Sequence, residues 1–158
     1  MLGRKRFTIE DFVETRAEPD AVMAMLRDPA TWPRWQSEIE TTSGPSPLER
    51  GDDVNGFARM IGFQVEGRSR TVDVSDRSLV EHAIVGVGMR ITYRVERSGS
   101  GTRIVRTLDA ILPGGLLGKP VAWALRRRLR KMQKKLLAAL AQAATTSPDH
   151  SRGHSQEK

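Results

Sequence analysis

The sequence predicts an α+β fold in which the helices are segregated from one antiparallel sheet. Its 158 residues are enough for a single domain with a core. Residues 38 to 112 consist of alternating apolar and polar segments divided by turn residues, with no helical pattern between them. Residues 18 to 28 and 120 to 144 instead carry apolar residues at helical spacing. Because no helix separates the strands, parallel crossover connections are excluded.

The N-terminal part predicts one strand followed by two short helices. Residues 7 to 17, FTIEDFVETRA, place apolar residues among polar neighbours at roughly the two-residue period of a half-buried strand. Residues 18 to 28 change to helical spacing behind a Pro-Asp start. Pro29 and Pro33 each remove a backbone donor, so this helix cannot continue and a second short helical turn is expected.

The middle of the chain predicts about six antiparallel strands. The stretches that divide them are rich in turn residues and read GPSPLERGDD, MIGF, SDRS, GVG and RSGSGT. Segments such as RITYRVER and TRIVRTLDAIL alternate apolar with polar or charged residues. This alternation indicates strands with one face toward the core and one toward water.

The C-terminal part predicts a connector, one long helix and a polar tail. Residues 113 to 120, PGGLLGKP, form the connector, and the helix runs to about residue 144. Residues 145 to 158 have few apolar side chains, so we expect a disordered tail after a single domain of residues 1 to 144. Steps of three and four keep seven apolar residues on one stripe of the helix: Val121, Leu125, Leu129, Met132, Leu136, Leu140 and Ala143.

Four motifs in this order resemble the START/polyketide-cyclase-like superfamily (SRPBCC), whose architecture is the helix-grip fold. PDAVMAMLRDPATWPRW resembles its pair of short helices, and LERGDDV resembles the glycine-bearing turn into its long hairpin. YRVERSGSGTRIV is similar to its last hairpin, and LPGGLLGKPVAWALRRRLRKMQKKLLAALAQA to its closing helix. The resemblance covers about residues 7 to 144.

The resemblance implies a curved seven-stranded antiparallel sheet that grips the long C-terminal helix, with an apolar cavity between them. Members bind lipids, sterols, polyketides or other hydrophobic molecules, and some are aromatase/cyclases. We therefore expect a module that carries or sequesters a hydrophobic small molecule. The alternative is a polyketide cyclase/dehydratase that acts on a poly-keto substrate in the same cavity. One departure is Met23, because family members often have tryptophan there.

Residues expected to line the cavity come from several elements. Flexible methionines suit walls that adapt to an irregular guest. Trp35, a stronger candidate than Trp32, lies in the proline-framed turn and could place its ring against a ligand and its indole N–H toward water. The stripe of the final helix supplies the opposite wall. The expected lining residues are Met23, Trp35, Met60, His82, Tyr93, Leu125, Leu129 and Met132.

Three polar residues are candidates for catalysis if the protein is an enzyme. In LVEHAIV, strand alternation puts His82 on the same face as Ile84, and we expect it to point inward, where imidazole could act as a base. Tyr93, which shares a face with apolar neighbours, could orient a guest through its hydroxyl group. Arg106 could polarise a carbonyl group of the ligand.

The positive charge is concentrated near the C-terminus. Residues 1 to 109 hold 16 Lys/Arg and 17 Asp/Glu, whereas residues 110 to 158 hold 10 and 2. On the long helix the basic side chains form one face, with Trp123 near its edge beside Arg127 and Arg130, and with Lys134 further along. An exposed indole favours a membrane interface over nucleic acid, so peripheral contact with an anionic membrane is expected and nucleic-acid binding is not.

Several other functions lack the residues they need. The chain contains no cysteine, which excludes disulfides, thiolate metal sites and a cysteine nucleophile. His150 and His154 lie in the polar tail without a zinc-site motif, so we expect no metal and no cofactor. The basic start MLGRKRF is not followed by an apolar segment, and no run of 18 apolar residues occurs. A cytoplasmic protein is expected.

Overall fold

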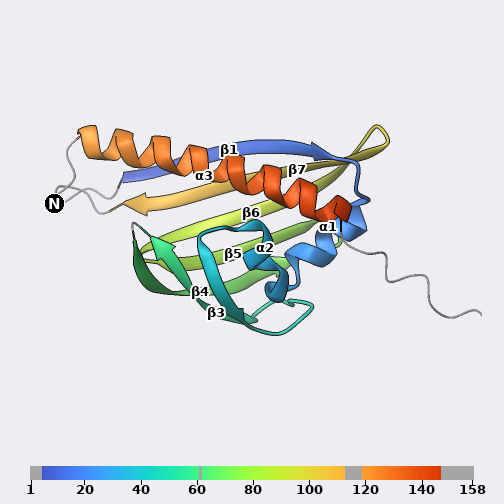
Figure 1. Ribbon diagram of the computed structural model, residues 1–158, viewed down its shortest axis with the longest axis horizontal. Coiled ribbons are helices and arrows are strands. Elements are labelled where there is room, and N and C mark those ends of the chain that lie inside the picture. Colours follow the sequence, from blue (N-terminus) through green and yellow to red (C-terminus); the bar gives the residue numbers. More distant parts are fainter. Residues whose placement is uncertain (1–4, 61, 113–118, 147–158) are drawn as a thin grey trace, which may run out of the picture.

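The computed structural model describes residues 5–60, 62–112 and 119–146, and it has the α+β architecture predicted from the sequence (Figure 1). One strand, three short helical segments, of which the last two are contiguous, six further strands and a long helix follow in the predicted order. The elements are β1 (Lys5–Thr15), α1 (Pro19–Leu26), the 3₁₀ helix η1 (Pro29–Thr31), α2 (Trp32–Trp35), β2 (Ile39–Ser43), β3 (Asp53–Met60), β4 (Phe63–Val74), β5 (Ser78–Val85), β6 (Val87–Ser98), β7 (Gly101–Leu112) and α3 (Lys119–Thr146).

The described strands form one antiparallel sheet in the order β1-β7-β6-β5-β4-β3-β2. From β2 to β7 each strand pairs with the next along the chain, and β1 pairs with β7 at the far edge. Two hairpin turns contain Gly86 and Gly99 at φ of 73° and 56°, a region that other residues rarely adopt. Short turns of this kind fix the register of the strands and hence which residues share a face.

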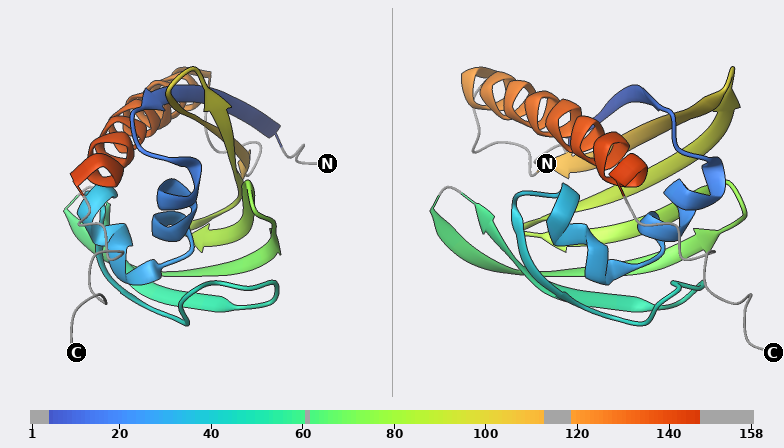
Figure 2. Two further views of the ribbon diagram at one scale, coloured as in Figure 1. Left: turned by 90° about the vertical axis from the view of Figure 1, so that its right-hand side faces the viewer. Right: turned by 45° about the vertical axis from the view of Figure 1, so that its right-hand side comes forward.

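The sheet is strongly curved, and α3 lies along its open side (Figure 2). In this arrangement α3 contacts β1 and β7 at one edge of the sheet. It also contacts the short helices α1 and α2. The sheet, the long helix and the short helices therefore enclose a common interior. The helix-grip architecture implied by the sequence resemblance is confirmed.

The short helices form a compact elbow stabilised by local hydrogen bonds. Pro19 occupies the first turn of α1, where its missing N–H is tolerated. The Asp28 carboxylate then accepts a hydrogen bond from the Ala30 N–H at 3.2 Å and caps η1. The indole of Trp32 donates to the Leu26 carbonyl at 3.1 Å, which ties α2 to the end of α1. This elbow holds the two tryptophans in fixed positions.

The apolar stripe predicted for the final helix faces the interior. Leu136 and Leu140 are buried among residues of the sheet and the short helices, and Leu125 and Leu129 are half-buried near β1. Gln133 lies on the same stripe and is also buried, although its side chain is polar. The stripe is therefore a packing face with one polar position in its middle.

The helix ends two residues beyond the predicted boundary. Thr145 and Thr146 belong to α3, where the Oγ1 atoms of both donate hydrogen bonds to the Gln142 carbonyl. The rest of the predicted tail, residues 147–158, and most of the predicted connector, residues 113–118, lie outside the described residues.

Candidate functional site

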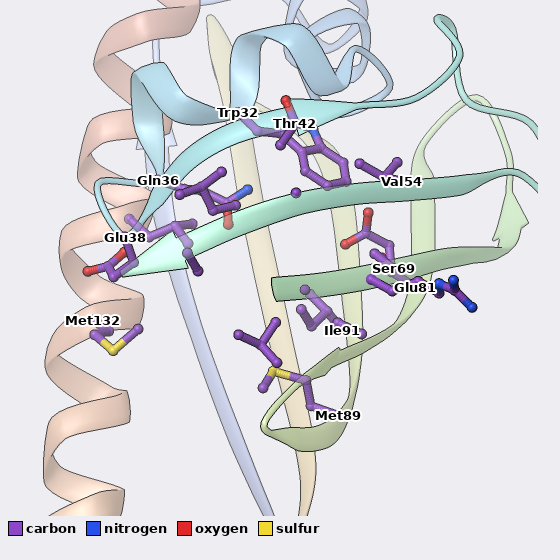
Figure 3. Close-up of a pocket in the computed structure, with 18 of the residues that line it drawn as sticks. Trp32, Gln36, Glu38, Thr42, Val54, Ser69, Glu81, Met89, Ile91 and Met132 are labelled. Carbon is purple, nitrogen blue, oxygen red and sulfur yellow. The ribbon is translucent and has the colours of Figure 1, made fainter. Parts of the chain in front are cut away.

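A cavity of about 170 Å³ lies between the inner face of the sheet and α3 (Figure 3). Its wall is mainly apolar. Figure 3 shows Met132 on the helix across from Ile91 and Met89 on the sheet, with Trp32 on the side of the short helices. Four buried polar residues also line it: Ser69, Glu81, Arg106 and Gln133.

The cavity exists because small residues face inward on three neighbouring strands. The inward positions that line it include Gly56 and Ala58 on β3, Gly67 and Ser69 on β4, and Ala83 on β5. Gly56 and Gly67 are opposite each other in the sheet, as are Ser69 and Ala83. A side chain at position 56 could not be accommodated, since its Cβ would lie 2.3 Å from the Thr41 carbonyl oxygen. Adjacent small side chains leave interior space that the helix residues do not fill.

Arg106 lines the cavity and is the centre of a buried hydrogen-bond network. Only 6% of the residue is exposed. Its Nε donates to the Tyr93 hydroxyl at 3.0 Å, and its Nη1 donates to the Gln133 Oε1 at 2.7 Å. The Gln133 amide in turn donates to the carbonyls of Arg106 and Ile9, at 3.2 and 3.4 Å. The network links β6, β7, β1 and α3 and fixes the guanidinium beside the cavity.

Glu81 is a buried acid in the same cavity, with 5% of the residue exposed. Burial raises its pKa to about 7, and the positive charge of Arg106 opposes this rise. Burial also raises the pKa of Tyr93, again against the effect of Arg106. Near neutral pH Glu81 therefore exists in both its protonated and its ionised form, a property typical of functional carboxyl groups.

The comparisons with known proteins agree with this architecture. A family model described as polyketide cyclase/dehydrase and lipid transport matches residues 6–145. The chain belongs to this family. No curated protein matches it in sequence.

Solved structures similar to this family member include aromatase/cyclases. The Zhui aromatase/cyclase from Streptomyces sp. R1128 superposes with a TM-score of 0.77 at 17% identity, covering 95% of this chain and 100% of that one. TTHA0849 from Thermus thermophilus has a TM-score of 0.70 at 17% identity, covering 90% and 100%. The di-domain ARO/CYC BexL, from the BE-7585A biosynthetic pathway, has a TM-score of 0.68 at 25% identity, covering 86% of this chain and 45% of that one.

Two of the eight predicted lining residues of this family member lie at the cavity. Leu129 and Met132 line it, and so does Arg106, which was predicted as a catalytic candidate. Trp32 lines it instead of Trp35, which the sequence had favoured.

Four other predicted lining residues lie elsewhere. Met23, Trp35 and Tyr93 are buried in the core but do not line the cavity. Leu125 packs against a small cluster formed by Phe7, Ile9 and Ala110. The side chain of Met60 lies outside what the structure describes.

The predicted inward orientation of His82 is wrong. On β5 the buried residues are Leu79, Glu81 and Ala83, so His82 points to the outer face with Ile84, which is 63% exposed. The strand alternates as predicted, but both of its faces carry apolar residues, and the face that packs on the core is the opposite of the predicted one. The polar side chain of this strand that faces the cavity is therefore Glu81, which was not among the predicted site residues.

Two polar residues missed by the sequence analysis contribute to the cavity. Glu81 lies between Leu79 and Ala83 on one face of β5, but His82 lies between Val80 and Ile84 on the other, so no signal in the sequence separated the two. Gln133 lies four residues after Leu129 and three before Leu136, so its spacing already puts it on the buried stripe. A polar residue in a buried helical position needs hydrogen-bond partners, and Arg106 supplies one.

The basic face of α3 is exposed and lies outside the cavity. We use this name for Arg126, Arg127, Arg130, Lys131 and Lys134, which surround a shallow depression together with Trp123. Trp123 is 62% exposed, and the guanidinium of Arg127 lies 5.5 Å from the centre of its ring. Within the described ranges no helix is long and apolar enough to cross a membrane, and no cluster of three or more potential metal ligands occurs.

Proposed function

We propose that this protein binds a hydrophobic small molecule in the cavity between the sheet and α3, as a carrier or sequestering module. The observation that carries the proposal is the cavity itself, whose wall is mostly apolar with a few buried polar groups. Ligand sites typically have this composition, because apolar walls supply affinity and placed polar groups set the orientation of the guest.

The size of the cavity favours a compact guest. A cavity of about 150 Å³ accepts benzene, so 170 Å³ suits a molecule of one or two rings. Met89 and Met132 both line the cavity, and their unbranched side chains can change rotamer at little cost. A somewhat larger guest therefore fits if these side chains move.

Filling the cavity is expected to weaken ligand binding. Ala83→Leu adds three carbons at an inward position of β5, and we expect affinity for apolar ligands to fall at least about tenfold. The measurement is native mass spectrometry of freshly purified protein, followed by titration with the ligand that co-purifies. His82→Leu is the matched control, since it places a leucine one residue away on the outer face. Equal binding by both variants would contradict the proposal.

A second candidate function is a polyketide cyclase/dehydratase reaction. It is favoured by a titratable carboxyl group and a fixed guanidinium in one apolar cavity. Glu81 would accept a proton from a methylene group between two ketones, and an Arg106 N–H would donate to the enolate oxygen formed. Consumption of a model poly-ketone by the wild type, abolished in Glu81→Gln but not in His82→Ala, would support it. Binding without consumption supports the carrier.

We propose further that the carrier contacts an anionic membrane through Trp123 and the basic face. The sequence contains no acidic residue between Asp109 and Asp149, so nothing on this face offsets its charge. Phe63 and Ile111 are also exposed. The strand ends that bear them lie at the same end of the molecule as the first turns of α3 (Figure 1). Exposed apolar side chains beside basic ones suit a lipid interface.

Removing two charges from the basic face is expected to weaken vesicle binding. Arg127→Gln with Arg130→Gln should cost about 2 kcal/mol, or roughly thirtyfold in affinity for phosphatidylserine vesicles. The matched control is Arg16→Gln with Arg50→Gln, which removes the same charge from exposed residues elsewhere. Co-sedimentation with phosphatidylserine and with phosphatidylcholine vesicles measures the effect. Equal losses in both double variants, or equal binding to both lipids, would contradict the membrane contact.

A further inference from the structure

Three buried polar atoms beside the cavity have no hydrogen-bond partner within the described part of the chain. They are the Ser69 Oγ, the Thr71 Oγ1 and the Glu81 Oε1. More than nine in ten buried polar groups in native proteins are paired, and an unpaired one destabilises the fold. Two of them, on Ser69 and Glu81, belong to residues that line the cavity, so a molecule bound there could be their partner.

The three atoms belong to neighbouring positions on the inner face of the sheet. Thr71 on β4 is opposite Glu81 on β5, and Ser69 is opposite Ala83, two residues further along. Ser69 and Glu81 both line the cavity, whereas Thr71 does not. Figure 3 shows Ser69 and Glu81 together on the sheet side. The cavity wall around them is apolar, so Ser69 and Glu81 form a small polar patch on it.

The charges beside this polar patch favour an uncharged ligand. Arg106 is close enough to Glu81 to oppose the rise of its pKa, so a cationic ligand would be repelled by the guanidinium. An anionic ligand would be repelled by Glu81 in its ionised form. The Arg106 Nε and Nη1 are already engaged by Tyr93 and Gln133, which hold the guanidinium in place.

We propose that Glu81 and Ser69 bind a hydroxyl group carried by an uncharged ring-shaped ligand. The hydroxyl donates to the Glu81 Oε1 and accepts from the Ser69 hydroxyl, which satisfies both atoms at once. A ketone or ether of the same shape can only accept, so it would leave the ionised Glu81 carboxylate without a donor. This inference rests on the proposed ligand-binding function and specifies the chemical class of the ligand.

The ionisation of Glu81 supplies a second readout. The groups that face it are Arg106 from β7, Tyr93 from β6, and Thr71 and Ser69 from β4. Burial raises its pKa to about 7, so the fraction ionised increases between about pH 6 and about pH 8. A carboxylate accepts a hydrogen bond more strongly than a carboxylic acid. Affinity for the hydroxylated ligand is therefore expected to increase as the pH rises through this range.

The test compares three probes of nearly the same shape: 2-naphthol, 2-methoxynaphthalene and naphthalene. We expect the wild type to bind 2-naphthol at least about tenfold more tightly than the other two. Glu81→Leu should reduce this preference to within about twofold, and Ser69→Ala should reduce it in part. Glu81→Gln keeps an acceptor oxygen and should retain the preference for 2-naphthol over naphthalene but lose its pH dependence. His82→Leu is the control on the outer face and should behave as the wild type.

Equal affinity of the wild type for the three probes, or a preference that survives in Glu81→Leu, would overturn the inference. Thermal unfolding without ligand shows whether each variant is folded. If Glu81→Leu does not fold, the loss of pH dependence in Glu81→Gln still tests the inference. Binding of naphthalene without preference would leave the proposed function intact and reject this inference alone. If no apolar ligand of any kind binds, the proposed function fails as well.

Discussion

Replacing Arg106 by leucine is expected to lower the free energy of unfolding by about 3–5 kcal/mol. The loss has two parts. The Tyr93 hydroxyl and the Gln133 Oε1 lose their donors inside the protein, and Glu81 loses the positive charge that favours its ionised form. The pKa of Glu81 should rise further as a result. Urea denaturation monitored by tryptophan fluorescence measures the effect.

The matched control is Arg103→Leu on the same strand. Arg103 is partly exposed, and its ion pair with Glu14 at 2.9 Å lies at the surface, so about 1 kcal/mol or less should be lost. In the double variant Arg106→Leu/Glu81→Leu the loss should be smaller than the sum of the two single losses, because no charge is then left unpaired. Similar losses for the two arginine variants would contradict the buried network.

Replacing Trp35 by alanine is expected to destabilise the fold by about 3–5 kcal/mol. Only 2% of Trp35 is exposed, and its ring meets Tyr93 edge-on with centroids 6.2 Å apart. The indole also donates to the Thr31 hydroxyl at 3.3 Å. Removing the ring leaves a void between the short helices, the sheet and α3. Denaturant unfolding measures the loss, and the m-value shows whether the transition remains cooperative.

Trp123→Ala is the control for Trp35→Ala, because it removes the same side chain from an exposed position. We expect a change within about 0.5 kcal/mol. Trp35 does not line the cavity, so ligand affinity of the Trp35 variant should be retained under conditions where it is folded. A variant of Trp35 with wild-type stability and lost binding would instead place this residue at the ligand, as the sequence had suggested.

The order and type of the elements could be predicted from the sequence because they depend on local patterns. The two-residue period of the strands, the helical spacing of α1 and α3, and the prolines that end α1 are each visible within a short window. The turn residues divide the strands where the hairpins occur, which also determines the antiparallel pairing of neighbours. The resemblance of four motifs to one superfamily then indicated how the elements are arranged.

The local sequence pattern does not identify the buried face of an element when both of its faces carry apolar residues. On β5, Val80 and Ile84 point outward while Leu79 and Ala83 point inward, so alternation alone could not decide between His82 and Glu81. Gln133 on α3 is a related case. Its spacing places it on the apolar stripe, but only the structure shows the buried partner, Arg106, that makes a polar residue possible there.

The sequence by itself thus determined the elements, their order and the apolar face of the last helix. The tertiary structure alone decided the cavity and its chemistry. The cavity is the space left between side chains from β3, β4, β5 and α3, so its position depends on which small residues strand pairing brings together. The pKa of Glu81 depends on burial and on Arg106, a residue 25 positions away in the chain that the fold places beside it.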